Sequence, residues 1–352
     1  MEPLRFGLIG CGRIATRHAK VISEMTGAEL AAVCDVRPER AEAVGKKYSV
    51  PWYTSHRQML AEASMDVVNV LTPSGDHAQP AIDAARAGRH VVVEKPMALT
   101  LDDADEMIRV CAEHNVRLFV VKQNRYNLAV QKLREARDRG RFGKMVLGTA
   151  RVRWCRTQEY YDQDDWRGTW AKDGGVLANQ ASHHIDLLEW MMGDVASVMA
   201  MTATRLVKIE TEDTAVAILR FRSGALGVIE ATTATRPRDL EGAISILGEQ
   251  GTVEIAGFAV NEIRTWQFSR PEPEDAEVVR TSAQRPPDQY GFGHARFLAN
   301  VVECIREGRP ALVDGLEGRR SLELILAIYE SVETGQEIEL RFQPKLCRLG
   351  LA

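Results

Sequence analysis

Residues 4–15, Leu-Arg-Phe-Gly-Leu-Ile-Gly-Cys-Gly-Arg-Ile-Ala, decide the fold of this chain. The first half, Leu4–Ile9, is a mostly apolar run that predicts a buried parallel strand. The second half has the form Gly-x-Gly-x-x-Ala and leads into a helical stretch. In this form Gly10 permits a tight turn and Gly12 lets the backbone approach a pyrophosphate. The stretch therefore predicts the first βα unit of a dinucleotide-binding domain, with Arg13 and Ile14 also at the cofactor.

An acidic residue closes the next predicted strand, residues 29–34. Asp35 is placed there to accept hydrogen bonds from the ribose hydroxyls of an adenosine. An acid at this position disfavours the additional phosphate of NADP, so NAD is the predicted cofactor, although Arg37 and Arg40 leave NADP open. A purely structural βα turn is the alternative. The order of strand, glycine turn, helix, strand and acid favours the dinucleotide.

The alternation of strand and helix continues to residue 122, with strands at 65–71 and 116–121 and helices at 79–87 and 101–114. The loop after strand 65–71 holds Thr72, Ser74 and His77, which can donate hydrogen bonds to ribose and phosphate oxygens. A second role is open for this loop, because Ser74 or Asp76 can cap the helix that follows. The loop is therefore predicted to contact the cofactor.

A buried strand ending at Val93 delivers Glu94 and Lys95, followed by Pro96, at its exit. In an open α/β sheet, ligands bind at the carboxyl ends of the strands. Lys95 is therefore predicted to take part in chemistry rather than to serve solubility alone.

The pattern changes after residue 122. Short strand-like runs separated by tight turns, such as residues 222–224 and 248–251, predict a mostly antiparallel sheet. Its strands are expected at 146–153, 198–206, 213–221, 225–231, 243–247 and 251–256, its helices at 177–192, 293–307 and 316–334, and an exposed loop at 275–288. The predicted fold class is α/β, with an N-terminal Rossmann domain at residues 1–122 and a C-terminal α/β domain with a mostly antiparallel open sheet at residues 123–352.

A second polar cluster lies on the predicted helix 177–192. Asn179 and His183 are four residues apart and share one face, and Asp186 lies one turn further on, near His183. His183 and His184 lie about 100° apart around a helix, so they converge poorly on one ion and no metal site is predicted. A purely structural helix remains the alternative.

The amino-acid composition limits the partners and the cellular location that can be expected. The chain has 352 residues, of which 45% are hydrophobic, and a net charge of −4. This near-neutral balance gives no reason to expect nucleic acid or a membrane surface as partner, and no apolar run approaches the roughly 20 residues of a membrane helix. Six cysteines without Cys-x-x-Cys pairs suit reduced thiols, so a cytoplasmic protein is expected.

The motifs together resemble the Gfo/Idh/MocA oxidoreductase family along essentially the whole chain. They are the glycine turn, Thr72-Pro73-Ser74 with His77, Glu94-Lys95-Pro96, Trp166-Arg167 and the Gly-Gly…His-x-x-Asp helix. The resemblance implies a cis Lys95–Pro96 bond, a Lys95 that reaches both nicotinamide ribose and substrate, and Gln123, Trp166 and Arg167 beside the cofactor. It also implies a homo-oligomer, dimer or tetramer, that associates through the C-terminal sheet.

One difference from the usual family motif makes the chain most similar to one branch of the family. Many family members carry Asp and Gly where this chain has Asn179 and Ala181. The Asn-Gln form is most similar to the branch that oxidises C3 of nucleotide sugars. It implies oxidation of the C3 hydroxyl of UDP-N-acetylglucosaminuronate (UDP-GlcNAcA) to a ketone, a step toward 3-amino sugars of surface polysaccharides, with 2-oxoglutarate as a further partner where NAD is recycled. The residues expected at the substrate are Lys95, Asn124, Arg125, Tyr126, Arg156, Asn179, His183, Arg236 and Tyr290, the arginines because guanidinium binds carboxylate and phosphate bidentately.

The mechanism follows from these side chains as a hypothesis. His183 is the natural general base near neutral pH, and Lys95 polarises the hydroxyl and orients the substrate. The alternative gives Lys95 the role of base, because desolvation lowers a lysine pKa. Rival functions are a dehydrogenase of UDP-N-acetylglucosamine, an inositol or another polyol, a non-catalytic NAD-binding regulator, and an NAD-dependent glycosidase.

Overall fold

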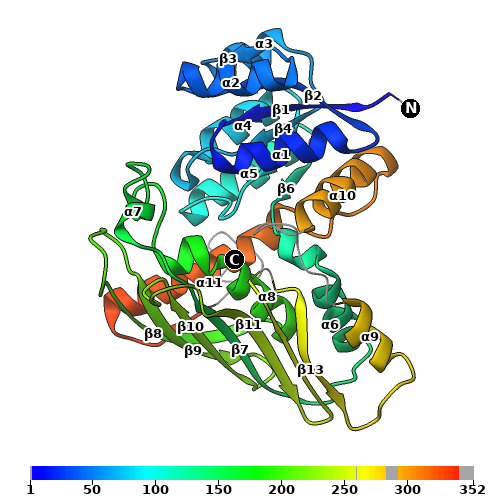
Figure 1. Cartoon of the computed structure of the whole chain (residues 1–352), viewed down its shortest axis with the longest axis vertical. Coiled ribbons are helices and arrows are strands. Elements are labelled where there is room, and N and C mark those ends of the chain that lie inside the picture. The colour runs from blue at the N-terminus through cyan, green and yellow to red at the C-terminus, as the bar shows by residue number, and fades with distance from the viewer. Residues whose placement is uncertain (1, 259, 283–291, 341–352) are drawn as a thin grey trace, which may run out of the picture.

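The computed structural model describes residues 2–258, 260–282 and 292–340 of the chain. It contains two sheets with helices packed on them, the smaller at the top of Figure 1 and the larger at the bottom. The smaller sheet is built from the first third of the chain, and the larger from residues that follow.

The smaller sheet has six strands in the order β3-β2-β1-β4-β5-β6, and every neighbouring pair is parallel. Its inner strands are apolar on both faces, and Val91, Val92 and Val93 are fully buried, as expected where helices cover both sides. The parallel, doubly wound arrangement predicted from the sequence is confirmed. The strands are β1 (Leu4–Ile9), β2 (Ala28–Cys34), β3 (Trp52–Tyr53), β4 (Val67–Val70), β5 (His90–Val93) and β6 (Leu118–Val120). The helices between them are α1 (Arg13–Glu24), α2 (Pro38–Tyr48), α3 (His56–Glu62), α4 (Ala78–Arg86) and α5 (Leu101–Glu113).

The larger sheet has eight strands in the order β13-β12-β11-β7-β10-β9-β8-β14. All neighbouring pairs are antiparallel except β7 and β10, so the predicted mostly antiparallel sheet is confirmed. The strands are β7 (Met145–Arg153), β8 (Val195–Ala203), β9 (Thr214–Phe221), β10 (Leu226–Thr232), β11 (Glu241–Gly248), β12 (Gly251–Ala256), β13 (Glu262–Phe268) and β14 (Ile338–Glu339). Helices α6 (Leu128–Asp138), α8 (Ser182–Met192) and α11 (Gly315–Thr334) lie on the side of this sheet that faces the smaller one (Figure 1).

The core of the smaller sheet includes side chains from the far end of the sequence. Phe297, Leu298 and Val301 of helix α10 (Gly293–Glu307) are buried in it, and α10 packs beside α1. Helix α11 then runs on toward the larger sheet, whose core contains its residues Leu324 and Ile328. The domain boundary at residue 122 stays a prediction, since the core of the first sheet extends well past it.

The structure differs from the prediction in several places, and helices α2, α3 and α7 (Gln158–Tyr161) and the short strands β3 and β14 were not predicted. Residues 275–288 were expected to be an exposed loop, but 275–282 form helix α9, whose Asp275 accepts hydrogen bonds from Arg141 and Trp266; 283–288 lie outside the described residues. Strand β13 was missed, because its half-buried face gives a weak apolar pattern. The predicted helix 177–192 is interrupted: residues Val176–Gln180 form a π-type turn before α8 begins at Ser182.

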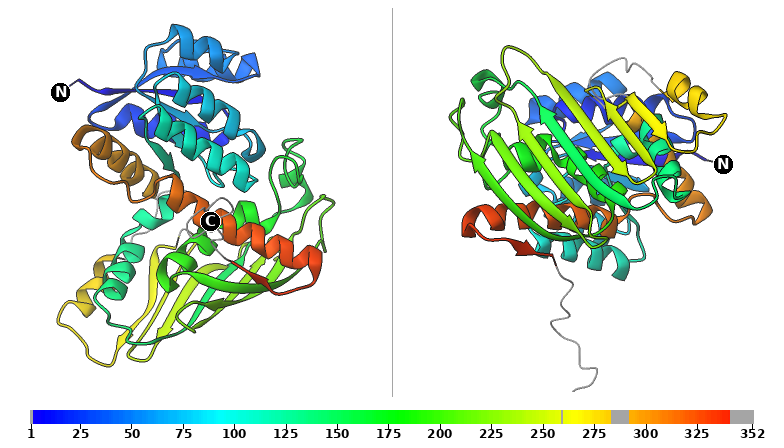
Figure 2. Two further views of the ribbon diagram at one scale, coloured as in Figure 1. Left: turned by 180° about the vertical axis from the view of Figure 1, so that it is seen from behind. Right: turned by 90° about the horizontal axis from the view of Figure 1, so that it is seen from below.

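The outer face of the larger sheet carries apolar side chains in neighbouring positions. Met201 pairs with Val216 and Met199 with Ile218 across β8 and β9, and these four side chains are exposed. In the view from below, the strands of the sheet face the viewer directly (Figure 2, right). None of the described helices is long and apolar enough to cross a membrane.

Candidate active site

A pocket of about 1810 Å³ lies at the carboxyl ends of the strands of the smaller sheet, where residues from the larger half close it. Ordinary small-molecule pockets have roughly 300–1,000 Å³. This one therefore has room for two ligands side by side. Most lining residues from the first third lie at or just beyond the ends of β1, β2, β4 and β5, and most of those from the second part lie in segments 154–173 and 179–183. Gln123, Glu210, Asp239, Phe258 and His294 also line the pocket.

The glycine turn after β1 has the shape that a dinucleotide requires. Gly10 has a φ of +98°, and a Cβ there would lie 2.6 Å from the Leu71 carbonyl oxygen, so only glycine fits. A Cβ on Gly12 would meet nothing within 4 Å, which leaves open space at the start of α1 where a pyrophosphate binds in such folds. Arg13 and Ile14 line the same end of the pocket. The cradle fits NAD.

Asp35 lies at the end of β2 as predicted, and it also holds the glycine turn. Its Oδ2 accepts a hydrogen bond of 2.7 Å from the Cys11 backbone N–H, and its Oδ1 accepts one of 2.9 Å from the Arg37 N–H. The carboxylate lines the pocket. It is therefore positioned next to the glycine turn by two backbone donors of its own chain.

The loop after β4 is fixed by its own side chains. Both ring nitrogens of His77 lie 2.9 Å from carbonyl oxygens, those of Thr72 and Pro96, and burial lowers the pKa of His77 below its ordinary value. The Thr72 hydroxyl donates to the Asp76 carbonyl. Thr72, Ser74 and His77 all line the pocket. The helix-capping role considered for Ser74 and Asp76 was wrong, because helix α4 has no side-chain cap.

Residues 160–167, from the second part of the chain, contribute several side chains that line the pocket. Arg40 of α2 pairs with Asp164 at 3.1 Å. The Arg167 guanidinium also hydrogen-bonds Asp164 and stacks on the ring of its neighbour Trp166. Trp166 and Arg167 line the pocket, so the predicted Trp-Arg pair lies on the same cavity as the glycine turn.

Lys95 leaves the end of β5 through a cis bond to Pro96 and points to the opposite wall. Its Nζ donates to the backbone oxygen of Asn179 at 2.8 Å and to the Asn179 Oδ1 at 3.3 Å. Burial lowers the pKa of the Lys95 ammonium, while the charges of Glu94 and Asp173 oppose that shift. The lysine is thus a buried cation held by oxygen acceptors.

Glu94 is held beneath Lys95 by a pair of buried histidines. His18 Nε2 lies 3.1 Å and His294 Nε2 lies 3.9 Å from Glu94 Oε1, and the other carboxylate oxygen accepts from the Lys95 backbone N–H. Burial alone would raise the pKa of Glu94, but the His18 hydrogen bond and the nearby positive charges lower it to about 2. Glu94 is therefore an anion at neutral pH.

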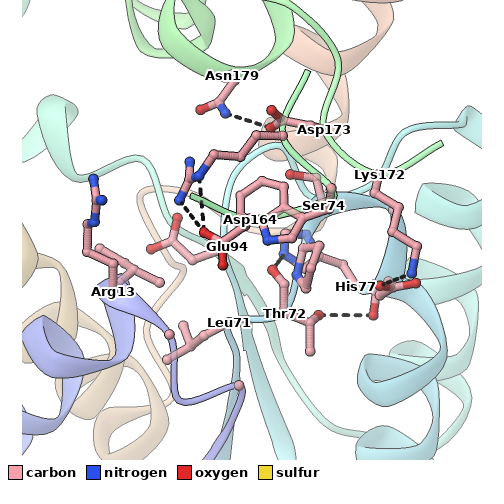
Figure 3. Close-up of a pocket in the computed structure, with 18 of the residues that line it drawn as sticks. Arg13, Leu71, Thr72, Ser74, His77, Glu94, Asp164, Lys172, Asp173 and Asn179 are labelled. Atoms are coloured by element: carbon pink, nitrogen blue, oxygen red, sulfur yellow. Dashed lines mark hydrogen bonds and ion pairs between the residues drawn. The ribbon is translucent and has the colours of Figure 1, made fainter. Parts of the chain in front are cut away.

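Asn179 connects Lys95 to a second buried acid. Its Nδ2 donates to Asp173 Oδ1 at 2.6 Å, as the dashed line in Figure 3 shows. The other oxygen of Asp173 accepts from the Gly168 backbone N–H. Burial raises the pKa of Asp173 to about 6. Sequence reasoning missed Asp173, although its place directly before the Gly174-Gly175 turn could have indicated it.

His183 lies in the same pocket as Lys95. Its Nε2 is 2.9 Å from the Gln123 side-chain amide nitrogen, and burial, reinforced by the charges of Lys95 and Lys122, lowers its pKa well below 6.5. The imidazole is therefore neutral near pH 7. The interpretation that placed Asp186 beside His183 is not supported, because Asp186 pairs with Arg125 and Lys122 instead.

Four of the residues predicted at the substrate do not line the pocket: Asn124, Arg125, Tyr126 and Arg236. The Arg125 guanidinium is buried and binds Asp186 at 2.8 and 2.9 Å, and Tyr126 donates to Asn300. Arg236 donates to backbone carbonyls near Arg156. Their guanidinium and hydroxyl groups are already engaged within the protein. Arg156 and Asn179 do line the pocket, and Tyr290 lies outside the described residues.

Part of the pocket wall carries polar atoms without hydrogen-bond partners. They are, among the described residues, Gln123 Oε1, Trp154 Nε1, both amide atoms of Gln180 and His183 Nδ1. These four residues also line the cavity. Buried polar groups are rarely left unpaired, so this wall is suited to a polar ligand. Trp154 and Gln180 were not predicted as site residues.

Two family models match almost the whole chain. One, described as "Oxidoreductase family, NAD-binding Rossmann fold", matches residues 4–122. The other, described as "Oxidoreductase family, C-terminal alpha/beta domain", matches residues 134–340. A myo-inositol 2-dehydrogenase of Thermotoga maritima is 29% identical over 347 residues, which cover 96% of this chain and 98% of that protein.

Two solved structures are more similar in sequence. The WlbA dehydrogenase from Bordetella pertussis, in complex with NADH and UDP-GlcNAcA, is 45% identical, with a TM-score of 0.91 and coverage of 97% of this chain and 99% of that one. The WlbA dehydrogenase from Chromobacterium violaceum, crystallised with the same two ligands, is 43% identical, with a TM-score of 0.92 and 98% coverage of both chains.

Proposed function

The chain belongs to the Gfo/Idh/MocA oxidoreductase family, and we propose that it oxidises the C3 hydroxyl of UDP-GlcNAcA to the 3-keto sugar with NAD. The observation that carries the proposal is the identity of 43–45%, over nearly the full chain, to two dehydrogenases solved with NADH and this nucleotide sugar. The pocket supports it, because its volume suits a dinucleotide together with a second large ligand.

Proton removal falls to His183 in this proposal. Alcohol oxidation needs an acceptor for the hydroxyl proton, and a neutral imidazole is such an acceptor. The depressed pKa of His183 keeps the ring neutral through the physiological pH range. NAD, when bound, supplies the hydride acceptor. In the ligand-free protein the Gln123 amide N–H donates to Nε2 and holds the ring, so the neutral imidazole carries its proton on Nδ1. The substrate hydroxyl takes the place of this amide at Nε2, which then accepts the proton.

Lys95 stabilises the developing alkoxide. Its ammonium is buried, and a positive charge acts more strongly on a nearby oxyanion where water is excluded. Asn179 holds the ammonium in place through two oxygen atoms. The depressed pKa of Lys95 keeps open the alternative in which the lysine itself takes the proton.

The test is an assay of NADH formation by the purified full chain. We expect turnover with UDP-GlcNAcA that exceeds turnover with UDP-N-acetylglucosamine and myo-inositol by at least about tenfold in kcat/KM. Lys95→Ala and His183→Ala are expected to lower kcat by about 10²- to 10⁴-fold. Circular dichroism and NADH binding serve as controls for folding. Near-normal turnover in both folded variants would refute the mechanism, and a preference for myo-inositol would refute the substrate.

The uncovered face of the larger sheet is proposed to bind a second copy of this chain. Its exposed apolar side chains are cross-strand neighbours on β8 and β9, and contiguous apolar surface of this kind is typical of subunit interfaces. The order of the oligomer, recycling of NADH by 2-oxoglutarate and a place in polysaccharide biosynthesis stay predictions.

A further inference from the structure

Gln180 is a buried glutamine on the pocket wall whose amide group has no hydrogen-bond partner. Only 6% of the residue is exposed, and neither Nε2 nor Oε1 has a partner among the described residues. An unpaired buried polar group lowers the stability of the folded protein. A glutamine kept in such a place at such a cost indicates a ligand that pairs with it.

The position of Gln180 relates it to the reacting carbon. It directly follows Asn179, whose backbone and side-chain oxygens both contact Lys95, and it precedes His183 by three residues in the segment that enters α8. Lys95 and His183 are the groups proposed to act on the C3 hydroxyl. Gln180 lines the same pocket as these two groups, and we therefore place it beside the sugar ring rather than at the uracil, which two phosphates and a ribose separate from that ring.

The two unpaired atoms differ in character, since Nε2 is a donor and Oε1 an acceptor. A secondary acetamide is trans, so its carbonyl oxygen and its N–H point in opposite directions and one glutamine amide pairs with only one of them. In UDP-GlcNAcA the carbon next to C3 bears an acetamido group, which offers one carbonyl oxygen and one N–H. The terminal torsion of glutamine is broad, so the amide can turn toward such a group.

We propose that Gln180 recognises the acetamido group on the sugar carbon next to the oxidised one, through a hydrogen bond from its Nε2 to the acetamido carbonyl oxygen. This inference rests on the proposed function and names its specificity-determining residue. Gln180 binds the substrate and takes no part in the proton or hydride transfer.

The test compares the binding of two ligands to full-length NADH-loaded protein by calorimetry: UDP-GlcNAcA and UDP-glucuronate, which has a hydroxyl in place of the acetamido group. Gln180→Met keeps the length of the side chain and removes both hydrogen-bonding atoms. We expect it to raise the Kd for UDP-GlcNAcA by about 30-fold and that for UDP-glucuronate by less than about threefold. Gln158→Met, the same change outside the pocket, should alter neither value.

A stability measurement separates recognition from a structural role. Because the amide is unpaired in the ligand-free protein, Gln180→Met should leave Tm unchanged or higher. An equal loss of affinity for both ligands, no loss for either, or a Tm several degrees lower would overturn the inference alone. Wild-type protein that binds UDP-GlcNAcA without oxidising it would refute the proposed function. The Kd values of wild type and Gln180→Met could still be compared in that case. Failure of the wild type to bind UDP-GlcNAcA would overturn both.

Discussion

The ammonium of Lys95 lies 2.8 Å from the backbone oxygen of Asn179 and 3.3 Å from its side-chain oxygen. The two residues come from different halves of the molecule, the end of β5 and the π-type turn before α8. Asp173 holds the Asn179 amide nitrogen at 2.6 Å, which directs its oxygen toward the lysine. The Lys95 ammonium is therefore oriented by the neutral side chain of Asn179, which is itself hydrogen-bonded to the Asp173 carboxylate.

Asn179→Asp should change the pH dependence of catalysis. The new carboxylate would face Asp173 where the amide now donates, and two adjacent carboxylates cannot both ionise freely, so the pKa of one rises. We expect the acid limb of the kcat profile to move up by at least about one pH unit, with activity near pH 9 within about threefold of wild type. A pH profile that coincides with that of the wild type would show that this amide is not coupled to the chemistry.

Asp35→Ser should weaken the preference for NAD over NADP. The substitution removes a negative charge from the pocket wall near Arg37 and Arg40, and the NADP phosphate no longer meets an acid. The ratio of kcat/KM for NAD to that for NADP is expected to fall by about 100-fold. Both affinities should also decrease, because the carboxylate holds the Cys11 and Arg37 N–H groups. An unchanged ratio would show that residues other than Asp35 determine the preference for NAD over NADP.

Glu212→Gln should stabilise the protein above neutral pH. The Oε1 atom of Glu212 accepts hydrogen bonds of 2.9 Å from the Leu177 N–H and the Tyr329 hydroxyl, and its Oε2 has no partner among the described residues. Burial raises the pKa of Glu212 from 4.5 to about 7. Between these values the folded state holds a proton that the unfolded state releases, so stability falls as pH rises across this window.

Glutamine keeps the acceptor and cannot ionise. We therefore expect a gain of up to about 3 kcal/mol in the free energy of unfolding at pH 8, which disappears near pH 4.5. Calorimetric Tm values at the two pH values provide the check. A variant less stable than wild type at pH 8 would contradict the expectation.

Arg125→Ala should affect stability rather than substrate affinity. The arginine is buried against Asp186, and removal of one partner of a buried pair costs about 3–5 kcal/mol. Arg236→Ala is the matched control, because that guanidinium is partly exposed and bonds backbone carbonyls. Thermal unfolding of both variants distinguishes the two environments, and an unchanged Tm for Arg125→Ala would show that the pair is dispensable.

Met201→Glu combined with Ile218→Glu should dissociate the proposed oligomer. Both side chains are exposed on the outer face of the larger sheet, at 74% and 57%, and buried carboxylates without partners are costly at an interface. Sedimentation velocity is expected to show a smaller species, with the far-ultraviolet circular dichroism spectrum of the wild type. The same sedimentation coefficient for both proteins would exclude this face as the interface.

The sequence predicted most of the smaller sheet, because β-branched runs that end in glycine or polar residues leave a strong local signal. Lys95 and the glycine turn were predicted as site residues because each follows such a run, and His183 was predicted because it shares a helix face with Asn179. Contacts between distant residues were harder to predict: the partner of Asp186 is Arg125, more than sixty positions away, rather than the nearby His183. Gln180 contributed to the Asn-Gln form of the motif but was not predicted as a site residue, since a missing hydrogen bond is a property of the folded surroundings and not of the residue.

Helix α10 has a consequence for how the protein is made. The chain is synthesised from its N-terminus, and the seven longer strands of the larger sheet all precede residue 293. Phe297, Leu298 and Val301 complete the first core only after those strands have left the ribosome. The nascent cofactor-binding half therefore carries an unfilled apolar surface throughout this interval, when such surfaces are prone to aggregate. Its final packing is therefore a late event that couples the maturation of both halves.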